Sequence, residues 1–180
     1  MDTPASPDDV SFRAALPGDV HALPPVARRI FTETFGSRFG GADFDAFCDA
    51  VYGPAGTMAR DLAHPAVSWR VAEQAGVPVG YAKLRPWTGS ASPEEPGAME
   101  LQQIYVVSWL HGSGIAEALM QWAVAEAHER AASSLYLTVF DHNERAKRFY
   151  ARHGFAEVGH CEFRLGDRVY DDRVWRRALG

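Results

Sequence analysis

A turn rich in small residues joins a strand-like run, Leu101–Val106, to a strongly helical segment from about Ala116 to Ala131. Its two glycines, Gly112 and Gly114, allow neighbouring backbone N–H groups to point outward from the turn. Those amides lie at the positive end of the helix dipole, where proteins bind phosphate or pyrophosphate groups. A Gly-x-Gly pair also marks ordinary loops, so anion binding at this turn needs a second signal.

The second signal follows the helical segment. Leu135–Phe140 is typical of a buried strand, and Asn143 after it is placed to cap a helix whose first turn holds the acidic Glu144. This helix is expected to present one apolar face and to end at a glycine, and the residues concerned are Ala146, Phe149, Tyr150 and Gly154. A glycine turn, a helix, a strand and a capped helix carrying a phenol therefore occur in this order.

The patterns Val-x-x-x-x-x-Gly-x-Gly-x-Ala, Asn-x-x-Ala-x-x-Phe-Tyr and Gly-Phe, in this order and spacing, resemble the GNAT superfamily of acetyl-CoA-dependent N-acetyltransferases. The resemblance covers residues 70–165 most clearly. It implies an α/β protein of the GNAT fold, with a mixed, mostly antiparallel central sheet, splayed parallel strands 4 and 5, and flanking helices. It also implies that acetyl-CoA is the cosubstrate and that no metal takes part.

By this resemblance, the turn holds the pyrophosphate of coenzyme A through the amides of His111, Gly112, Ser113, Gly114, Ile115 and Ala116. Ser108 stands where the family usually has proline, and His111 stands where glutamine or arginine is usual. Ala116 stands where glycine or alanine occurs, so it lies within the pattern. Because His111 lacks a permanent charge, the phosphate contacts are expected from the backbone, and direct contact by its ring stays open.

The strand before the turn is the second part of the implied cofactor site. In the family this strand separates from its parallel neighbour, and its main chain pairs with the pantetheine arm as an added strand would. Ile104, Tyr105 and Val106 are the residues at this position, and an amide there would polarise the thioester carbonyl. A plain core strand explains Ile104 and Val106 equally well, but it explains the polar pair Gln102-Gln103 less well.

Tyr150 is the main catalytic candidate. A phenol near the sulfur would give a proton or a hydrogen bond to the departing thiolate of coenzyme A, as the family often does from this helix. Asn143 is expected to touch the cofactor arm as well as to cap the helix. The base that deprotonates the amine is left open between Glu100, His160 and water, and a buried structural role is favoured for His160.

Composition narrows the functional classes. With 18 basic and 23 acidic residues, the net charge is 18 − 23 = −5, so no basic surface indicates nucleic-acid binding. Cys48 and Cys161 lack metal or redox spacing and are expected to be free thiols. No apolar run reaches membrane-span length, and Met1–Ala5 lacks a secretion signal, which favours the cytoplasm and no membrane partner. A homodimer is left open.

The remaining periodicities predict the elements that position these residues. A flexible N-terminus is expected over residues 1–10, followed by a single domain over residues 11–180. Within it we expect a strand at 11–16, a helix ending near Phe35 that becomes regular only from Pro24 and Pro25, and a short helix capped by Asp43. A third short helix is expected at 58–63, a hairpin at 67–84, a loop at 88–97, a strand at 99–106 and a final strand pair at 155–179. The helix after the glycines is expected to pack through one face, formed by Ile115, Ala118, Leu119, Trp122 and Ala125.

The acceptor is expected to be a primary amine, attacked in a ternary complex without a protein nucleophile. Ala27–Phe35 and Gly159–Asp167 are similar, more loosely, to the Pai-type polyamine acetyltransferases, which implies a small amine such as a polyamine. The acidic residues of the early helices, expected to be solvated, could attract such a cation; they are Glu33, Asp43, Asp45 and Asp49. An N-terminal or lysine acetyltransferase and a non-catalytic acyl-CoA sensor are the alternatives. A Rossmann site and a kinase-type phosphate loop fail on motif order.

Overall fold

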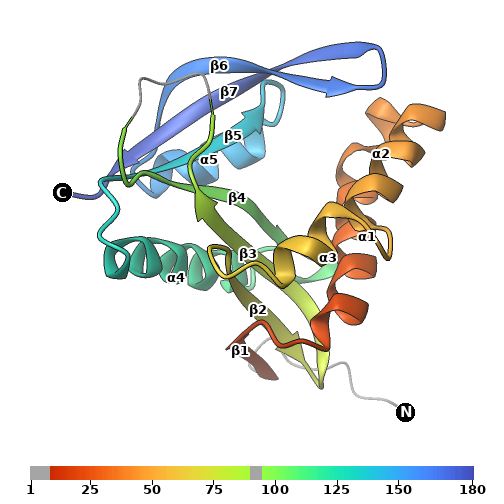
Figure 1. The fold of residues 1–180 in the computed structure, drawn as a ribbon, viewed down its shortest axis with the longest axis horizontal. Helices are drawn as coiled ribbons and strands as arrows, with labels where there is room; N and C mark the ends of the chain where they lie inside the picture. Colours follow the sequence, from red (N-terminus) through yellow and green to blue (C-terminus); the bar gives the residue numbers. More distant parts are fainter. Residues whose placement is uncertain (1–8, 90–94) are drawn as a thin grey trace. The chain divides into compact units, whose positions relative to one another are not determined.

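The computed structural model describes residues 9–89 and 95–180. Its elements run β1 (Val10–Ala14), α1 (Asp19–Phe39), α2 (Ala42–Tyr52), α3 (Thr57–Leu62), β2 (Ser68–Gln74), β3 (Val77–Pro86), β4 (Met99–Val106), η2 (Ser108–Leu110), α4 (Ile115–Glu129), β5 (Ser134–Phe140), α5 (Glu144–Arg152), β6 (Ala156–Leu165) and β7 (Arg168–Ala178). Figure 1 labels them along the chain.

The strands are hydrogen-bonded in the order β1-β2-β3-β4-β5-β7-β6. The pairs β1–β2, β5–β7 and β6–β7 are antiparallel, whereas β4 and β5 run parallel. The parallel register consists of two residue pairs, Met99 with Leu135 and Glu100 with Tyr136. This mixed, mostly antiparallel sheet with a parallel central pair and accompanying helices confirms the predicted fold class.

The expected flexible N-terminus lies largely outside the described residues, since the description begins at residue 9 and Val10 already opens β1. The central residues of the expected loop at 88–97 also lie outside the description. The chain divides into two compact units, one comprising Met1–Lys83 and Gln103–Leu119, the other Leu84–Gln102 and Met120–Gly180. No helix of the described part of the chain is both long and apolar enough to cross a membrane.

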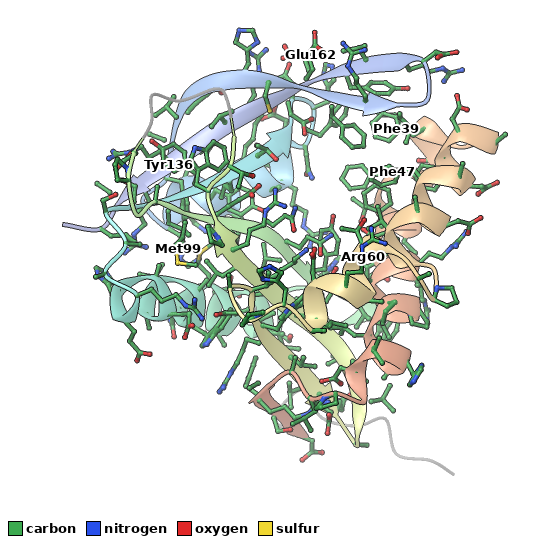
Figure 2. All side chains as sticks on the ribbon, in the orientation of Figure 1. Phe39, Phe47, Arg60, Met99, Tyr136 and Glu162 are labelled. Atoms are coloured by element: carbon green, nitrogen blue, oxygen red, sulfur yellow. The ribbon has the colours of Figure 1, made fainter. Side chains whose placement is uncertain are left out.

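The first unit has an aromatic core between its early helices. The Phe31 ring lies 4.9 to 5.7 Å, centroid to centroid, from the rings of Phe35, Phe44, Phe47 and Tyr52. Figure 2 shows Phe39 and Phe47 projecting from the same side of α1 and α2. Such ring pairs contribute about 0.5–1.5 kcal/mol each beyond their buried area, so they fix α2 against α1.

The predicted late start of α1 is wrong, because the helix begins at Asp19 and continues through Pro24 and Pro25. Two prolines remove two helical N–H donors, and their cost is offset at the first turn by a buried carboxylate. The Asp19 carboxylate accepts from the Leu16 amide at 2.6 Å and from both terminal nitrogens of Arg13 at 2.7 and 2.9 Å. The Arg13 guanidinium holds the pKa of Asp19 below its usual value, against the opposing effect of burial.

The expected cap of α2 is wrong. Asp43 does not cap this helix; Gly41, with φ +126°, occupies the N-cap position, and Asp43 lies in the first turn, where the helix dipole favours its negative charge.

The expected face of α4 is confirmed in part. Ile115 and Leu119 are buried, Ala118 and Trp122 are half-buried, and Ala125 is exposed. The other buried positions are Met120, Ala123 and Ala127, because alanine and tryptophan do not mark a face unambiguously.

The second unit is built around the β5–β7–β6 sheet, whose β6–β7 hairpin is drawn in blue in Figure 1. Glu95 ties the segment before β4 to this sheet. Its carboxylate accepts hydrogen bonds from Ser133 Oγ at 2.9 Å, Ser134 Oγ and Tyr136 OH at 2.6 Å, and the Arg176 guanidinium at 3.0 and 3.1 Å. Trp87 stacks on the Tyr136 ring, with centroids 4.6 Å apart.

Glu95→Gln should lower the free energy of unfolding by roughly 1–2 kcal/mol at pH 7, because the amide accepts fewer of these bonds and leaves the guanidinium uncompensated. Arg176 first, then Ser134 and Tyr136, lower the pKa of Glu95, so its contribution is present above pH 4.5 and declines in acid. Urea denaturation at pH 7 and at lower pH measures this, and the difference between the two proteins should shrink in acid.

Glu162→Gln is the matched control. Glu162 projects outward from β6 in Figure 2, and its carboxylate forms an ion pair with the exposed Arg164. Exposed pairs contribute little, so this variant should stay within about 0.5 kcal/mol of wild type. Equal losses in the two variants would show that Glu95 is an ordinary surface carboxylate.

Candidate active site

The turn between β4 and α4 contains two glycines in the left-handed backbone region. Gly112 and Gly114 adopt φ values of +82° and +86°, a region that residues with side chains rarely occupy. The 3-10 helix η2 precedes them, closed by hydrogen bonds from the Leu110 amide to Val107 O and from the His111 amide to Ser108 O. The two glycines therefore allow the chain to make a tight turn between η2 and α4.

The turn leaves several N–H groups for a ligand. The Ser113 amide donates to Leu110 O at 3.3 Å, and the Ala118 amide opens the helical ladder by donating to Gly114 O at 3.0 Å. The amides of the first turn before Ala118, beginning at Ile115, have no intrahelical acceptor by the geometry of an α-helix. A Cβ placed on Gly112 or Gly114 would meet no atom within 4 Å, so the space beside the turn is open.

The polar side chains of the turn are directed at its own main chain. His111 Nε2 donates to Val106 O at 2.9 Å, and Ser113 Oγ donates to Leu110 O at 2.7 Å. These bonds hold the turn against the end of β4. Both side chains are therefore occupied within the turn, and phosphate contact by the backbone amides stays a prediction.

Helix α1 is tied to the same turn by a short polar chain. Ser108 Oγ donates to Glu33 Oε2 at 3.1 Å, and Arg29 Nε donates to the other oxygen of Glu33 at 2.9 Å. The Arg29 guanidinium also lies 4.6 Å from the centroid of the exposed Trp109 ring, within cation–π range. Ser108, at the position where the family usually has proline, thus contributes a hydrogen bond that proline could not.

Strand β4 approaches β3 closely just before the turn. An added Cβ on Gly80 would lie 2.8 Å from the Tyr105 carbonyl oxygen, so only glycine fits there without a shift. The Val107 amide donates to Val79 O at 2.9 Å, and Tyr81 OH donates to Gln103 Oε1 at 3.1 Å. These contacts fix the main chain at Ile104, Tyr105 and Val106, of which the first two are half-buried and Val106 is buried.

Glu100, the predicted base, is 5% exposed and its Oε2 accepts from Arg85 Nε at 2.6 Å. The Glu100 carboxylate is thus engaged by a guanidinium, and its place in the mechanism stays a prediction.

Tyr150 lies on α5, whose start is fixed as predicted. Asn143 caps the helix by accepting from the Ala146 amide at 3.2 Å, and Gly154, at φ +81°, follows its end. The half-buried Tyr150 ring contacts Phe149 and Phe155, with centroids 5.6 and 6.0 Å away. Burial raises the pKa of the Tyr150 phenol, so it keeps its proton at neutral pH and can act as an acid.

The favoured burial of His160 is wrong, since its side chain is 72% exposed and its Nδ1 lies 3.5 Å from Asp171 Oδ1. The two cysteines are free, as expected: Cys48 is buried and Cys161 half-buried, and burial raises the pKa of both thiols. The residues that the structure describes contain no group of three or more His, Cys, Asp or Glu side chains placed to hold a metal ion.

The acidic residues of the early helices are largely solvated. Asp43 and Asp45 are exposed, Asp49 pairs with Arg28, and Glu33 belongs to the link with the glycine turn. None of the four faces an enclosed site within the part of the chain that the structure describes.

Asp172 on β7 was not predicted as a site residue. Its Oδ1 is buried and finds no hydrogen-bond partner among the described residues. The sequence does contain a sign of this residue. Tyr170, Asp172 and Val174 alternate along the strand, so the carboxylate shares a face with two less polar side chains. Arg168–Ala178 carries six charged residues, and that abundance obscured the phase of this one.

Three comparisons place this geometry among known proteins. A sequence model described as the Acetyltransferase (GNAT) family matches residues 26–155. An uncharacterized N-acetyltransferase of Mycobacterium bovis is 33% identical over 161 residues, which cover 89% of this chain and 98% of the relative. The crystal structure of a PaiA N-acetyltransferase from Thermoplasma acidophilum in complex with coenzyme A superposes with a TM-score of 0.76 at 15% identity, covering 94% of this chain and 98% of that one.

A third similar protein is the ribosomal-protein-alanine N-acetyltransferase from Brucella melitensis, with a TM-score of 0.69 at 23% identity. It covers 94% of this chain and 99% of its own.

Proposed function

Since this chain belongs to the GNAT acetyltransferase family, and is therefore an acyltransferase with acetyl-CoA as its donor, we propose that its acceptor is a small primary amine such as a polyamine. The observation that carries the donor half of this proposal is the glycine turn, with outward amides at the head of α4 and open space beside them. We propose that the turn from His111 to Ala116 binds the pyrophosphate there, chiefly through the amides of Gly112, Gly114, Ile115 and Ala116, because those of His111 and Ser113 donate within the turn.

Two observations support a small amine. The segments Ala27–Phe35 and Gly159–Asp167 are similar to the Pai-type polyamine acetyltransferases, and the PaiA protein is a structural neighbour. The net charge of −5 also favours approach of a cation. We further propose that the enzyme acts in the cytoplasm.

The reaction needs no protein nucleophile, because an amine attacks a thioester directly once both are held together. Both thiols are held in the protonated form by burial, which makes them poor nucleophiles. The amine nitrogen forms its bond to the acetyl carbon as the carbon–sulfur bond breaks. In our proposal Tyr150 gives its proton to the leaving sulfur. A backbone amide near Ile104 to Val106 donates a hydrogen bond to the carbonyl oxygen and so stabilises the negative charge that develops there.

A thiol-release assay tests this function. Purified protein with acetyl-CoA should release free coenzyme A when spermidine or another short diamine is added, and it should do so more slowly with amino acids and with peptides bearing a free N-terminus. Faster turnover of the peptides would favour the protein N-terminal acetyltransferase instead. Tight binding of acetyl-CoA without thiol release for any amine would favour a sensor.

A further inference from the structure

One face of the second unit's sheet carries a carboxylate that the reaction as described does not use. Side chains alternate along β7, so Tyr170, Asp172 and Val174 project from the same face. In the antiparallel registers Asp172 lies opposite Phe140 on β5 and opposite Cys161 on β6. Directly opposed residues share a face, so all three strands contribute to the surroundings of Asp172.

These surroundings are aromatic and apolar. The Tyr170 ring contacts Phe140 edge-on, with centroids 6.3 Å apart, and Phe163 at 6.4 Å. On the other side Val174 belongs to a buried cluster with Ala98 and Tyr136, against which Trp87 and Cys161 pack. Asp172 therefore stands between a group of three rings and an apolar cluster.

No cation among the described residues compensates Asp172. The charge that acts on the pKa of Asp172 is that of another carboxylate, Asp171 on the same strand, and Glu100 on β4 acts together with Asp172 on the Cys161 thiol. The charge of Glu100 is already paired with Arg85, and Arg173, on the opposite phase of β7, pairs with Asp141 and Asp171. A buried carboxylate oxygen without a donor is costly, so its retention calls for a ligand that supplies one.

A protonated amine supplies both missing features, since an ammonium group donates to a carboxylate and is attracted to the faces of aromatic rings. We propose that Asp172 is the general base of the acetyl transfer and that the face formed by Phe140, Phe163, Tyr170 and Asp172 receives the acceptor's ammonium group. This assignment rests on the proposed function, because it presumes an amine acceptor.

The proton balance is complete without another reactant. The ammonium group gives one proton to the Asp172 carboxylate, which frees the nitrogen lone pair for the carbon–nitrogen bond. A second proton leaves the nitrogen as the amide forms and restores the phenol of Tyr150, which has given its own proton to the departing sulfur. Asp172 then returns the first proton to water. Burial first, and Asp171 second, raise the pKa of Asp172 to about 6, so the group is ionised at pH 7 but nearly matched to that pH, as an efficient base should be.

The test compares wild type with Asp172→Asn, in which the shape is kept and the base removed. With the best amine from the thiol-release assay, kcat/KM of the wild type should decrease as the pH falls through about 6, which gives the pH profile an acid limb. In Asp172→Asn we expect kcat to fall about 10²-fold to 10⁴-fold and the limb to disappear. Acetyl-CoA affinity by calorimetry should stay near wild type, and Asp172→Glu should restore part of both rate and limb.

Asp171→Asn is the matched control, because it makes the same change of charge one residue away at an exposed position. It should keep wild-type kcat and move the limb slightly toward acid, since Asp171 contributes to the raised pKa of Asp172. Glu100→Gln should retain the limb near pH 6, whereas loss of the limb in that variant alone would return the role to Glu100.

Retention of both rate and limb by a folded Asp172→Asn enzyme overturns the inference and leaves the proposed function intact. Asp172→Ser serves the same purpose if the asparagine variant does not fold. A wild-type protein that binds acetyl-CoA but acetylates no amine would remove the proposed function, and this inference with it. The two failures are therefore distinguished by the wild type alone.

Discussion

Tyr150→Phe should lower kcat by about 10-fold to 10⁴-fold while the Kd for acetyl-CoA stays near its wild-type value. The change removes one oxygen atom and leaves the ring among Phe149 and Phe155, so the packing of α5 should be preserved. Because burial raises the pKa of Tyr150, the phenol is protonated throughout the neutral range. Its loss should therefore lower kcat by the same factor at each neutral pH and leave the shape of the pH profile unchanged there. Steady-state kinetics and calorimetry measure the two quantities.

Tyr52→Phe provides the control for removing a phenol of equal size. Tyr52 is buried in the aromatic core of the first unit, and burial raises the pKa of its phenol too. Its variant should keep kcat within about threefold of wild type, since a structural hydroxyl acts on stability rather than on proton transfer. A Tyr150→Phe enzyme with unchanged kcat would take Tyr150 out of the mechanism.

Gly114→Val should weaken acetyl-CoA binding by about 100-fold or more, equivalent to roughly 2.7 kcal/mol. A β-branched residue at φ +86° is strained, and the turn can relieve that strain only by rotating the peptide planes that aim the amides. The space beside Gly114 is open, so the protein should still fold. Calorimetric titration with acetyl-CoA measures the loss, and thermal unfolding checks that the fold survives.

Gly18→Val is the comparison at a glycine outside the turn. Gly18 precedes α1 with φ −68°, also with no atom within 4 Å of an added Cβ, so valine is accommodated there without strain. This variant should bind acetyl-CoA as the wild type does. Normal binding by Gly114→Val would show that the amides of this turn do not hold the pyrophosphate.

Several signals that depend on a few neighbouring residues predict the structure correctly, whereas the Asp43 cap and the late start of α1 are wrong. The bounds of β4, the Asn143 cap and the glycine after α5 agree with the structure, since each follows from alternation, a side-chain acceptor or a positive φ. The family and its fold followed from the order of these signals, and the match over residues 26–155 confirms them.

The features that sequence reasoning missed depend on partners distant in the chain. Arg85 neutralises Glu100 across fifteen positions, and no periodicity announces that contact. His160 is exposed, and Asp172 lies opposite Phe140 on β5 and Cys161 on β6, with one of its carboxylate oxygens buried. Charge state and exposure of a strand residue are set by register, which alternation within one strand does not fix.

The prolines within α1 divide that helix into two stretches with different supports. Pro24 and Pro25 cannot donate to the carbonyl groups one turn before them, so the opening turn is held by the Asp19 carboxylate and Arg13 instead of by the regular ladder. The stretch after the prolines is held by stacked rings from α2. The first turn of α1 therefore depends on the Arg13–Asp19 ion pair for its conformation. The rest of the helix is held by its regular hydrogen bonds and by ring packing.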